Sequence, residues 1–383
     1  MPNRFLLRGR VITPLRELVA ATVLVERGRI AWVKRGEVDV PGSTLLTSAG
    51  DTVTPGFIDL QVNGLAGHDA ASGADEITAI SSLLPRYGVT AFLPTLISRP
   101  IDEVVAFVDA CAAAAAPGAR VLGAHVEGPF LNPSYCGAHD PECLLLPKHE
   151  HVTRLLRRPP RMVTLAPELP GALRAIEMLT AAGVTVSAGH SGASFAEAEQ
   201  GFVAGVRFGT HLFNAMAPLH HREPGLPGAL LSESRVTVGL IADGVHVHPA
   251  MLALAVKVAG PGRVALTSDA TAAAGSPAGR YMIAGRETFS DGTSARLADG
   301  TLAGSAVTMN RMVHLMATLP GLTLRDAVEM ATLTPARVLG VEGESGVLRR
   351  GARADLVILD NDHRVKLTLV AGQVAFSAGG MDA

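Results

Sequence analysis

Eight short apolar segments of strand length recur through the middle of the chain and constrain its fold more than any other feature. They lie at 57–60, 90–93, 121–124, 162–165, 184–187, 206–209, 236–240 and 264–267. Helix-forming stretches such as 170–182 and 194–204 separate most of them. Continuous apolar strands that alternate with helices predict an α/β fold with a parallel sheet buried on both faces. Eight such units fit a (β/α)8 TIM barrel. An open doubly wound sheet is the alternative, although neither Gly-x-Gly-x-x-Gly after the first strand nor a Walker-type loop is present.

The two ends of the chain show a different pattern from its middle. Short runs rich in apolar and β-branched residues lie at 4–12, 22–33, 354–359, 365–370 and 373–376. Strands at both ends predict that the termini meet in one small β-sandwich domain. We expect residues 1–53 with 346–383 to form this domain and residues 54–345 to form the barrel. The 383 residues suffice for both, since such a barrel takes roughly 250.

Composition excludes several classes of protein. With 48% hydrophobic and 18% charged residues, the chain can bury a large core and is not a disordered protein. Lys and Arg number 33 against 35 Asp and Glu, so no basic excess favours binding to nucleic acid or anionic membranes. No apolar run reaches the roughly 18 residues that span a bilayer. Charges near the N-terminus interrupt any secretory segment, and an odd count of three cysteines favours a reducing compartment. We therefore expect a cytoplasmic protein.

Four ionisable residues follow four different predicted strands: Glu127, His190, His211 and Asp269. In a barrel the carboxyl ends of the strands meet at one face, where reactive residues gather. One carboxylate and two imidazoles can hold a divalent metal and leave a position for water, whose pKa then falls toward roughly 7. Asp269 suits a general base that takes the proton of this water. The alternatives are that a single histidine is a hydrogen-bonded core residue and that Asp269 caps a helix.

Taken together, the motifs at these strand ends identify a family. They are Pro55-Gly56-Phe57-Ile58-Asp59, His125-Val126-Glu127-Gly128-Pro129, Leu165-Ala166-Pro167-Glu168, Ser187-Ala188-Gly189-His190-Ser191, Thr210-His211-Leu212-Phe213-Asn214-Ala215-Met216, Arg222-Glu223-Pro224-Gly225, Ile241-Ala242-Asp243-Gly244, Ser268-Asp269-Ala270-Thr271 and Thr301-Leu302-Ala303-Gly304-Ser305. This ordered set resembles the N-acetylglucosamine-6-phosphate deacetylases of the amidohydrolase superfamily, over nearly the whole chain. The resemblance implies a barrel with a β-sandwich, a homodimer, and hydrolysis of N-acetyl-D-glucosamine 6-phosphate to D-glucosamine 6-phosphate and acetate. Such a reaction belongs to amino-sugar catabolism or cell-wall recycling.

The resemblance also implies a role for individual residues. Glu127, His190 and His211 would hold one divalent metal, and Asp269 would be the catalytic acid and base. Zn is the expected ion, with Fe, Co, Ni and Mn as alternatives. Gln61 and Asn63 stand where many amidohydrolases carry His-x-His, so one strongly bound metal is expected. The expected substrate contacts are Ala138, His139, Asn214, Ala215, Arg222, His246, Leu302, Ala303 and Gly304, with Arg222 reaching the active site of the neighbouring subunit.

Other functions stay open at this point. N-acetylgalactosamine 6-phosphate or another N-acyl compound could be the substrate instead. A catalytically silent barrel used as a binding scaffold should lack at least one of the four ionisable residues, yet all four are present. Arg222 could be an ordinary solvated loop charge, and His125 is expected to support the site rather than bind metal. The segment 131–147 is expected to be a loop that covers the site, with Cys136 and Cys143 as free thiols.

Overall fold

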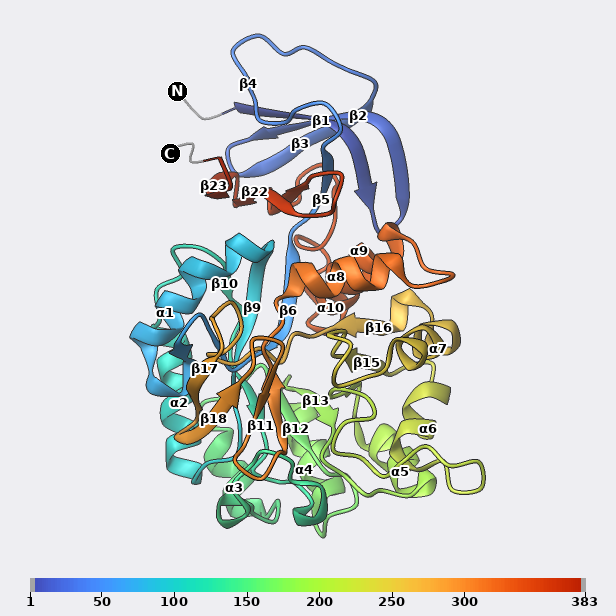
Figure 1. Ribbon diagram of the computed structural model, residues 1–383. Coiled ribbons are helices and arrows are strands. Elements are labelled where there is room, and N and C mark those ends of the chain that lie inside the picture. The colour runs from blue at the N-terminus through green and yellow to red at the C-terminus, as the bar shows by residue number, and fades with distance from the viewer. Residues whose placement is uncertain (1–3, 380–383) are drawn as a thin grey trace.

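A parallel β-barrel forms the centre of the computed structural model, which describes residues 4–379 (Figure 1). Its strands are β6 (Phe57–Val62), β9 (Val89–Leu96), β11 (His125–Glu127), β12 (Met162–Leu165), β13 (Thr185–Ala188), β14 (Phe208–Gly209), β15 (Thr237–Leu240) and β16 (Val264–Leu266). Each strand pairs in parallel with the next. A parallel bridge between Val62 and Ala270 brings the end of the last strand back beside the first. The predicted eight-stranded barrel is thus confirmed.

Helices cover the outside of this barrel. They are α1 (Ala74–Leu83), α2 (Ile101–Ala113), α3 (His149–Leu155), α4 (Ala172–Ala181), α5 (Phe195–Ala204), α6 (Gly225–Ser232), α7 (Pro249–Ala259), α8 (Met309–Thr318), α9 (Leu324–Ala331) and α10 (Leu333–Val338). Short 3-10 helices occupy Ala70–Ser72, Leu84–Tyr87, Pro133–Tyr135, Pro141–Cys143 and Pro261–Arg263. The start of α5 illustrates how the sequence sets a boundary, because Ser194 and Glu197 form a capping box there. Within residues 4–379, no helix is long and apolar enough to cross a membrane.

The third barrel strand begins later than the sequence suggested. The apolar run at 121–124 was expected to be this strand, but only β10 (Arg120–Val121) is extended there, and it pairs with β9. Gly123 interrupts the strand with a φ of 120°, a conformation that residues with a side chain rarely adopt. The chain then re-enters the barrel as β11. His125 and Glu127 therefore lie within the strand and not after it.

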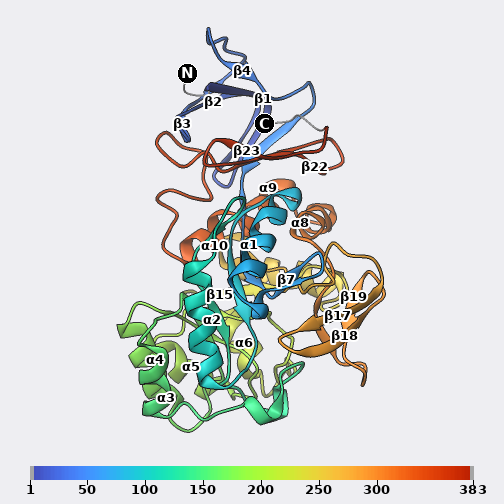
Figure 2. The same ribbon diagram turned by 90° about the vertical axis from the view of Figure 1, so that its left-hand side faces the viewer.

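A second sheet combines the two termini (Figures 1 and 2). It contains β1 (Arg4–Thr13), β2 (Arg16–Glu26), β3 (Arg29–Arg35), β4 (Thr44–Leu45), β5 (Thr52–Pro55), β21 (Leu356–Leu359), β22 (Val365–Val370) and β23 (Gln373–Ser377). The antiparallel pair of β5 with β21 joins the N-terminal to the C-terminal strands. Leu7 and Val23 pack with Leu356 and Leu367 in a core separate from that of the barrel. The expected β-sandwich from both termini is present, while the exact domain limits stay a prediction.

An antiparallel sheet that the sequence analysis missed follows the last barrel strand. Its strands are β17 (Gly279–Ile283), β18 (Arg286–Ser290), β19 (Ser294–Arg296) and β20 (Leu302–Ser305), and Figure 2 shows this sheet at one side of the barrel. A separate two-stranded ribbon pairs β7 (Gly64–Leu65) with β8 (His68–Asp69). A bridge from Ala270 to Ser305 ties β20 to the segment after β16. This connection places residues 301–304 at the face of the barrel where the strands end.

Candidate metal centre and active site

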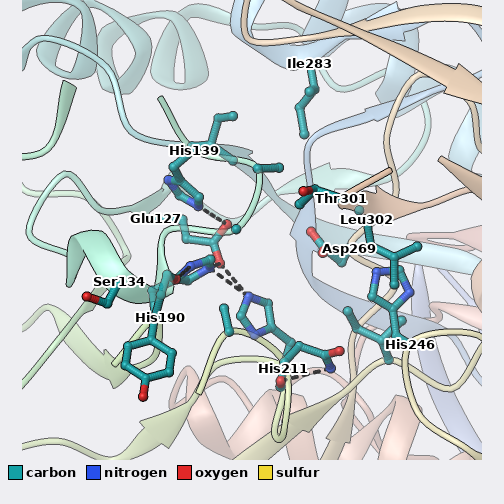
Figure 3. Close-up of a pocket in the computed structure, with 18 residues that line it drawn as sticks. Glu127, Ser134, His139, His190, His211, His246, Asp269, Ile283, Thr301 and Leu302 are labelled. Carbon is teal, nitrogen blue, oxygen red and sulfur yellow. Dashed lines mark hydrogen bonds and ion pairs between the residues drawn. The ribbon is translucent and has the colours of Figure 1, made fainter. Parts of the chain in front are cut away.

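A cavity of about 350 Å³ opens at the carboxyl ends of the barrel strands (Figure 3). Its size and position match those of small-molecule sites in barrel enzymes. The lining residues come from the strand ends, from the segment 131–147 and from the antiparallel sheet. They are Ile97, Glu127, Ser134, Tyr135, Gly137, Ala138, His139, His190, His211, Asn214, Ala215, Ile241, His246, Asp269, Ile283, Thr301, Leu302 and Gly304.

The floor of the cavity holds a tight cluster of Glu127, His190 and His211. Each of the three offers one ligand atom, and these atoms lie within 4.8 Å of one another. His190 Nε2 is 3.0 Å from His211 Nε2, and the two nitrogens are 3.2 and 3.0 Å from Glu127 Oε1. All three side chains are buried. The structure thus brings together the three residues that the sequence placed at the ends of different strands.

The chemistry of this donor set fits a divalent cation. His190 Nδ1 lies 2.9 Å from the carbonyl oxygen of Tyr135, which can only accept, so Nδ1 carries the hydrogen. The Nε2 lone pair of His190 is therefore free and points at the cluster. His211 likewise directs its Nε2 at the cluster. Its Nδ1 is buried without a hydrogen-bond partner among the described residues. One carboxylate oxygen and two imidazole nitrogens that converge in this way are a donor set typical of Zn and similar ions.

Three of the site residues have an unusual backbone conformation. His190, His211 and Asp269 have φ values of 50°, 30° and 47°, in the left-handed region that glycine favours. Such residues cost about 1–3 kcal/mol each and persist only where the surrounding structure holds them. They occur where the chain turns sharply out of a strand, and the turn directs each side chain into the cavity.

Asp269 faces the cluster from the opposite side of the cavity (Figure 3). No helix begins at this residue, so its interpretation as a helix cap is wrong. Its Oδ1 accepts a hydrogen bond from Asn63 Nδ2 at 2.8 Å. Burial, followed by repulsion from the carboxylate of Glu127, raises the pKa of Asp269 to about 8. A carboxyl group that binds a proton this readily suits proton transfer near neutral pH.

Glu127 has the opposite electrostatic character. Burial opposes its ionisation, but interactions with the surrounding rings of His139, His190 and His211 outweigh burial and hold its pKa well below the ordinary value. Gln61 Nε2 donates a further hydrogen bond to Glu127 Oε1 at 3.0 Å. The amide of Gln61 thereby supports the carboxylate of the cluster. Two carboxyl groups in one cavity thus differ in charge, which suits one as a ligand and the other as a proton carrier.

Two further histidines point into the cavity with one ring nitrogen already engaged. The backbone N–H of Ser98 donates to His139 Nδ1 at 3.0 Å, so in the neutral ring Nε2 carries the hydrogen and faces the cavity. Burial, and then repulsion from His190, lowers the pKa of His139 to about 4 and keeps it neutral. His246 Nδ1 lies 2.6 Å from Asp243 Oδ2. Burial opposes ionisation of Asp243, but its hydrogen bonds to His246 and Val245 lower its pKa below the ordinary value.

The remaining predicted residues fall into two groups. Those that line the cavity are Ala138, Asn214, Ala215, Leu302 and Gly304. Ala303 is fully buried but does not line the cavity. It lies between Leu302 and Gly304 in the strand, and these two neighbours do line it. Arg222 is exposed, does not line the cavity of its own chain, and contacts His221 Nε2 at 3.0 Å.

His125 also lies outside the cluster. Its Nδ1 is 3.0 Å from the carbonyl oxygen of Leu60, and its Nε2 is 2.8 Å from Thr164 Oγ1. With both nitrogens engaged, it supports the barrel interior and offers no lone pair to the cavity. The cysteines of the segment 131–147, Cys136 and Cys143, are both free thiols.

Several lining residues were not predicted from the sequence. They are Ile97, Ser134, Tyr135, Gly137, Ile241, Ile283 and Thr301. Ser134, Tyr135 and Gly137 precede the predicted Ala138 and His139, so their place in the same loop was a usable signal. The isoleucines carry no comparable signal, because an apolar residue near a strand end is more often part of the core.

Residues 52–375 match the amidohydrolase family. The chain belongs to the amidohydrolase family. An N-acetylgalactosamine-6-phosphate deacetylase of Escherichia coli O157:H7 is 40% identical to it, over 85% of this chain and 88% of the relative. The human N-acetylglucosamine-6-phosphate deacetylase is 38% identical, over 86% of this amidohydrolase and 84% of the relative.

Solved structures agree with these relatives. The fold matches that of an aspartate-to-alanine variant of N-acetyl-D-glucosamine-6-phosphate deacetylase from Mycobacterium smegmatis in complex with N-acetyl-D-glucosamine 6-phosphate. That match has a TM-score of 0.93 and 35% identity, and it covers 98% of this amidohydrolase and all of the other chain. The N-acetylglucosamine-6-phosphate deacetylase of Pasteurella multocida matches with a TM-score of 0.92 at 29% identity, over 97% and 99% of the two chains.

Proposed function

We propose that this amidohydrolase hydrolyses N-acetyl-D-glucosamine 6-phosphate to D-glucosamine 6-phosphate and acetate. The observation that carries the proposal is the placement of Asp269 across one small cavity from the cluster of Glu127, His190 and His211. The names of the human and mycobacterial relatives support the substrate. The reaction belongs to amino-sugar metabolism, and a reducing cytoplasmic location accords with the free thiols.

Glu127, His190 and His211 would hold one divalent ion, with Zn as the expected metal and Fe, Co, Ni or Mn as alternatives. When bound, this cation would polarise the amide carbonyl, lower the pKa of the attacking water and favour the ionised form of Asp269. Gln61 supports single-metal occupancy, because it stands where many amidohydrolases carry a histidine and a neutral amide is a poor ligand for a transition metal.

Asp269 then moves one proton in two steps. Its carboxylate takes a proton from water as the water oxygen bonds to the amide carbon and the carbonyl becomes tetrahedral. The same carboxyl group gives that proton to the sugar nitrogen as the carbon–nitrogen bond breaks, because an amine anion is a very poor leaving group. Acetic acid and the free amine result, and the acid gives its remaining proton to the amine or to solvent to become acetate. His139 Nε2–H lies 3.6 Å from Glu127 Oε2 at the lining of the cavity, and it could donate a hydrogen bond to a substrate oxygen instead.

The phosphate end of the substrate would be bound by residues farther from the cluster. The proposed contacts are His246, whose ring Asp243 orients, and the segment of Asn214 and Ala215. Ala138, Leu302 and Gly304 are proposed as further contacts. Arg222 is proposed to complete this end of the site from the neighbouring subunit of a homodimer, where its planar guanidinium could bind phosphate in a bidentate manner. Its exposure and its position outside the cavity of its own chain support this arrangement.

Substituting Asp269→Asn tests the proposal. We expect kcat for acetate release to fall by about two to four orders of magnitude, because the amide cannot carry the proton. Metal content measured by elemental analysis should stay at the wild-type value, and Asp75→Asn, at an exposed position in α1, is the matched control. Wild-type kcat in the Asp269→Asn variant would refute the mechanism. Wild-type protein without stoichiometric divalent metal would instead favour a binding scaffold.

A specific observation favours one second substrate. The relative at 40% identity is named an N-acetylgalactosamine-6-phosphate deacetylase, so the epimer at the sugar's C4 is a candidate. Comparison of kcat/KM on the two phosphorylated epimers and on unphosphorylated N-acetylglucosamine decides between them. A higher kcat/KM on the galacto epimer would replace the proposed substrate while leaving the chemistry intact.

A further inference from the structure

Glu168 lies directly behind the metal-ligand candidate His190 but does not line the cavity. It follows β12, while His190 follows β13, and these parallel strands are paired with Leu165 opposite Ala188. The register therefore brings the segment after β12 beside the turn that carries His190.

The carboxylate of Glu168 is used entirely to hold neighbouring chain segments. Its Oε1 accepts hydrogen bonds from the backbone N–H of Gly192 at 2.7 Å and from Asn132 Nδ2 at 2.9 Å. Its Oε2 accepts a hydrogen bond from Ser191 Oγ at 2.7 Å. Each oxygen thus has its own donors, and the partly buried Glu168 makes no ion pair with any Lys, Arg or His among residues 4–379. A carboxylate, which only accepts when it is ionised, can satisfy all three donors at once.

The same contacts bind His190 to the segment 131–147. The backbone N–H of Asn132 donates to the carbonyl oxygen of His190 at 3.1 Å, and His190 Nδ1 donates to the carbonyl oxygen of Tyr135 at 2.9 Å. The Tyr135 ring packs on Gly192, where an added Cβ would lie 2.5 Å from the ring. The turn 190–192 and the start of the loop are therefore one packed unit, and Glu168 contacts both parts of it.

We propose that Glu168 is a positioning residue that holds His190 in its left-handed conformation and aims its Nε2 at the metal. This inference rests on the metal site of the proposed function. A left-handed conformation at a residue other than glycine persists only when neighbouring groups fix it, and three hydrogen bonds to the two residues that follow His190 and to Asn132 provide that constraint. Groups that orient a metal ligand typically contribute 10- to 100-fold to metal affinity.

The test compares Glu168→Ala and Glu168→Gln with wild type in the full-length protein. Zn²⁺ affinity is measured by competition with a chromophoric chelator, and the ligand geometry is read from the visible absorption spectrum of the Co²⁺-loaded protein. We expect Glu168→Ala to lower Zn²⁺ affinity about 10- to 100-fold and to change the Co²⁺ spectrum. Glu168→Gln should lose less Zn²⁺ affinity than Glu168→Ala, because its Oε1 can still accept hydrogen bonds from Gly192 and Asn132. Glu199→Ala, at an exposed position in the neighbouring helix α5, is the matched control and should keep wild-type affinity.

The outcomes separate the two proposals. If wild type binds no stoichiometric Zn²⁺, the metal site itself is refuted. If wild type binds Zn²⁺ and Glu168→Ala binds it within twofold, with an unchanged Co²⁺ spectrum, only the positioning role is refuted. Should Glu168→Ala fail to fold, Ser191→Ala and Glu168→Gln each remove a single contact, and wild-type Zn²⁺ affinity in both would likewise overturn the role of Glu168.

Discussion

At the scale of single residues, the site depends on side chains whose conformations run against local preference. His190, His211 and Asp269 could be predicted as neighbours from the sequence, because the carboxyl ends of parallel strands meet at one face. Their left-handed backbones could not be predicted, since no feature of the local sequence favours them there. The strain is set by the tertiary contacts of the turns, as the hydrogen bonds from Asn132 and to Tyr135 show for His190.

Asp59 provides a prediction of the pH dependence of stability. It is fully buried, and burial raises its pKa from 3.8 to about 6, against hydrogen bonds from Ser268 and Gln61. The folded state therefore holds the proton of the Asp59 carboxyl group more tightly than the unfolded state does. The stability that this protonated group contributes is complete below pH 3.8 and is lost as the pH rises to about 6. The free energy of unfolding should therefore fall by about 3 kcal/mol across that window through Asp59 alone.

The measurement is urea unfolding of wild type and Asp59→Asn between pH 3.5 and pH 8, since the variant cannot titrate at this position. The difference in unfolding free energy between the two proteins should change between about pH 4 and 6 and stay constant above. Asp75→Asn, at an exposed position, controls for the substitution itself. A difference that does not vary with pH would show that Asp59 titrates alike in the folded and unfolded states.

At the scale of elements, the sequence predicts well wherever a segment is long and uniformly apolar. All eight residues of β9 are buried, and a strand was expected there from the apolar run at 90–93. The strand that was misplaced, β11, has three residues and follows the interruption at Gly123. The antiparallel sheet at 279–305 was not predicted because its strands are short and many of their exposed side chains are polar. Its Ala284-Gly285 and Asp291-Gly292 turns were the available signal.

The antiparallel sheet contacts the loop beside the cavity through Arg286. Its Nη1 donates to the carbonyl oxygen of Ala138 at 2.6 Å and so ties β18 to the loop that carries His139. Arg286→Met removes this contact, and we expect KM for the acetamido sugar phosphate to rise about tenfold with a smaller change in kcat. Steady-state kinetics and the thermal midpoint would be measured together, with the midpoint expected to change little.

Arg280→Met is the matched control, because Arg280 lies in the same sheet at an exposed position and contacts Phe289 and Glu287 away from the cavity. Arg286→Lys should recover part of the loss, since an ammonium group can also donate to a carbonyl oxygen. Unchanged KM in Arg286→Met would mean that the loop keeps its place without this contact.

At the scale of the whole molecule, the fold leaves one catalytic question that a single chain cannot answer. The segment between β14 and α6 extends from the barrel near α5 and α6 (Figure 1), and Arg222 lies on it, exposed and outside the cavity. The prediction that this arginine binds phosphate came only from the family resemblance and stays a prediction. In the proposed dimer, the partner of Arg222 lies on another subunit, and no pattern within one chain encodes the distance between two chains.

Mixed dimers test whether Arg222 acts on the neighbouring subunit. Arg222→Ala and Asp269→Asn should each be nearly inactive alone. If Arg222 acts across the interface, a mixed dimer has one intact site, built from Asp269 of the first variant and Arg222 of the second. Equal mixing with subunit exchange should then restore about a quarter of wild-type activity, since half of the dimers are mixed and each has one of two sites intact. The control pairs Asp269→Asn with the double variant Arg222→Ala/Asp269→Asn, which can form no intact site and should stay inactive. Absence of recovery in the first mixture, with exchange verified by mass spectrometry, would place the action of Arg222 within its own subunit or outside the reaction.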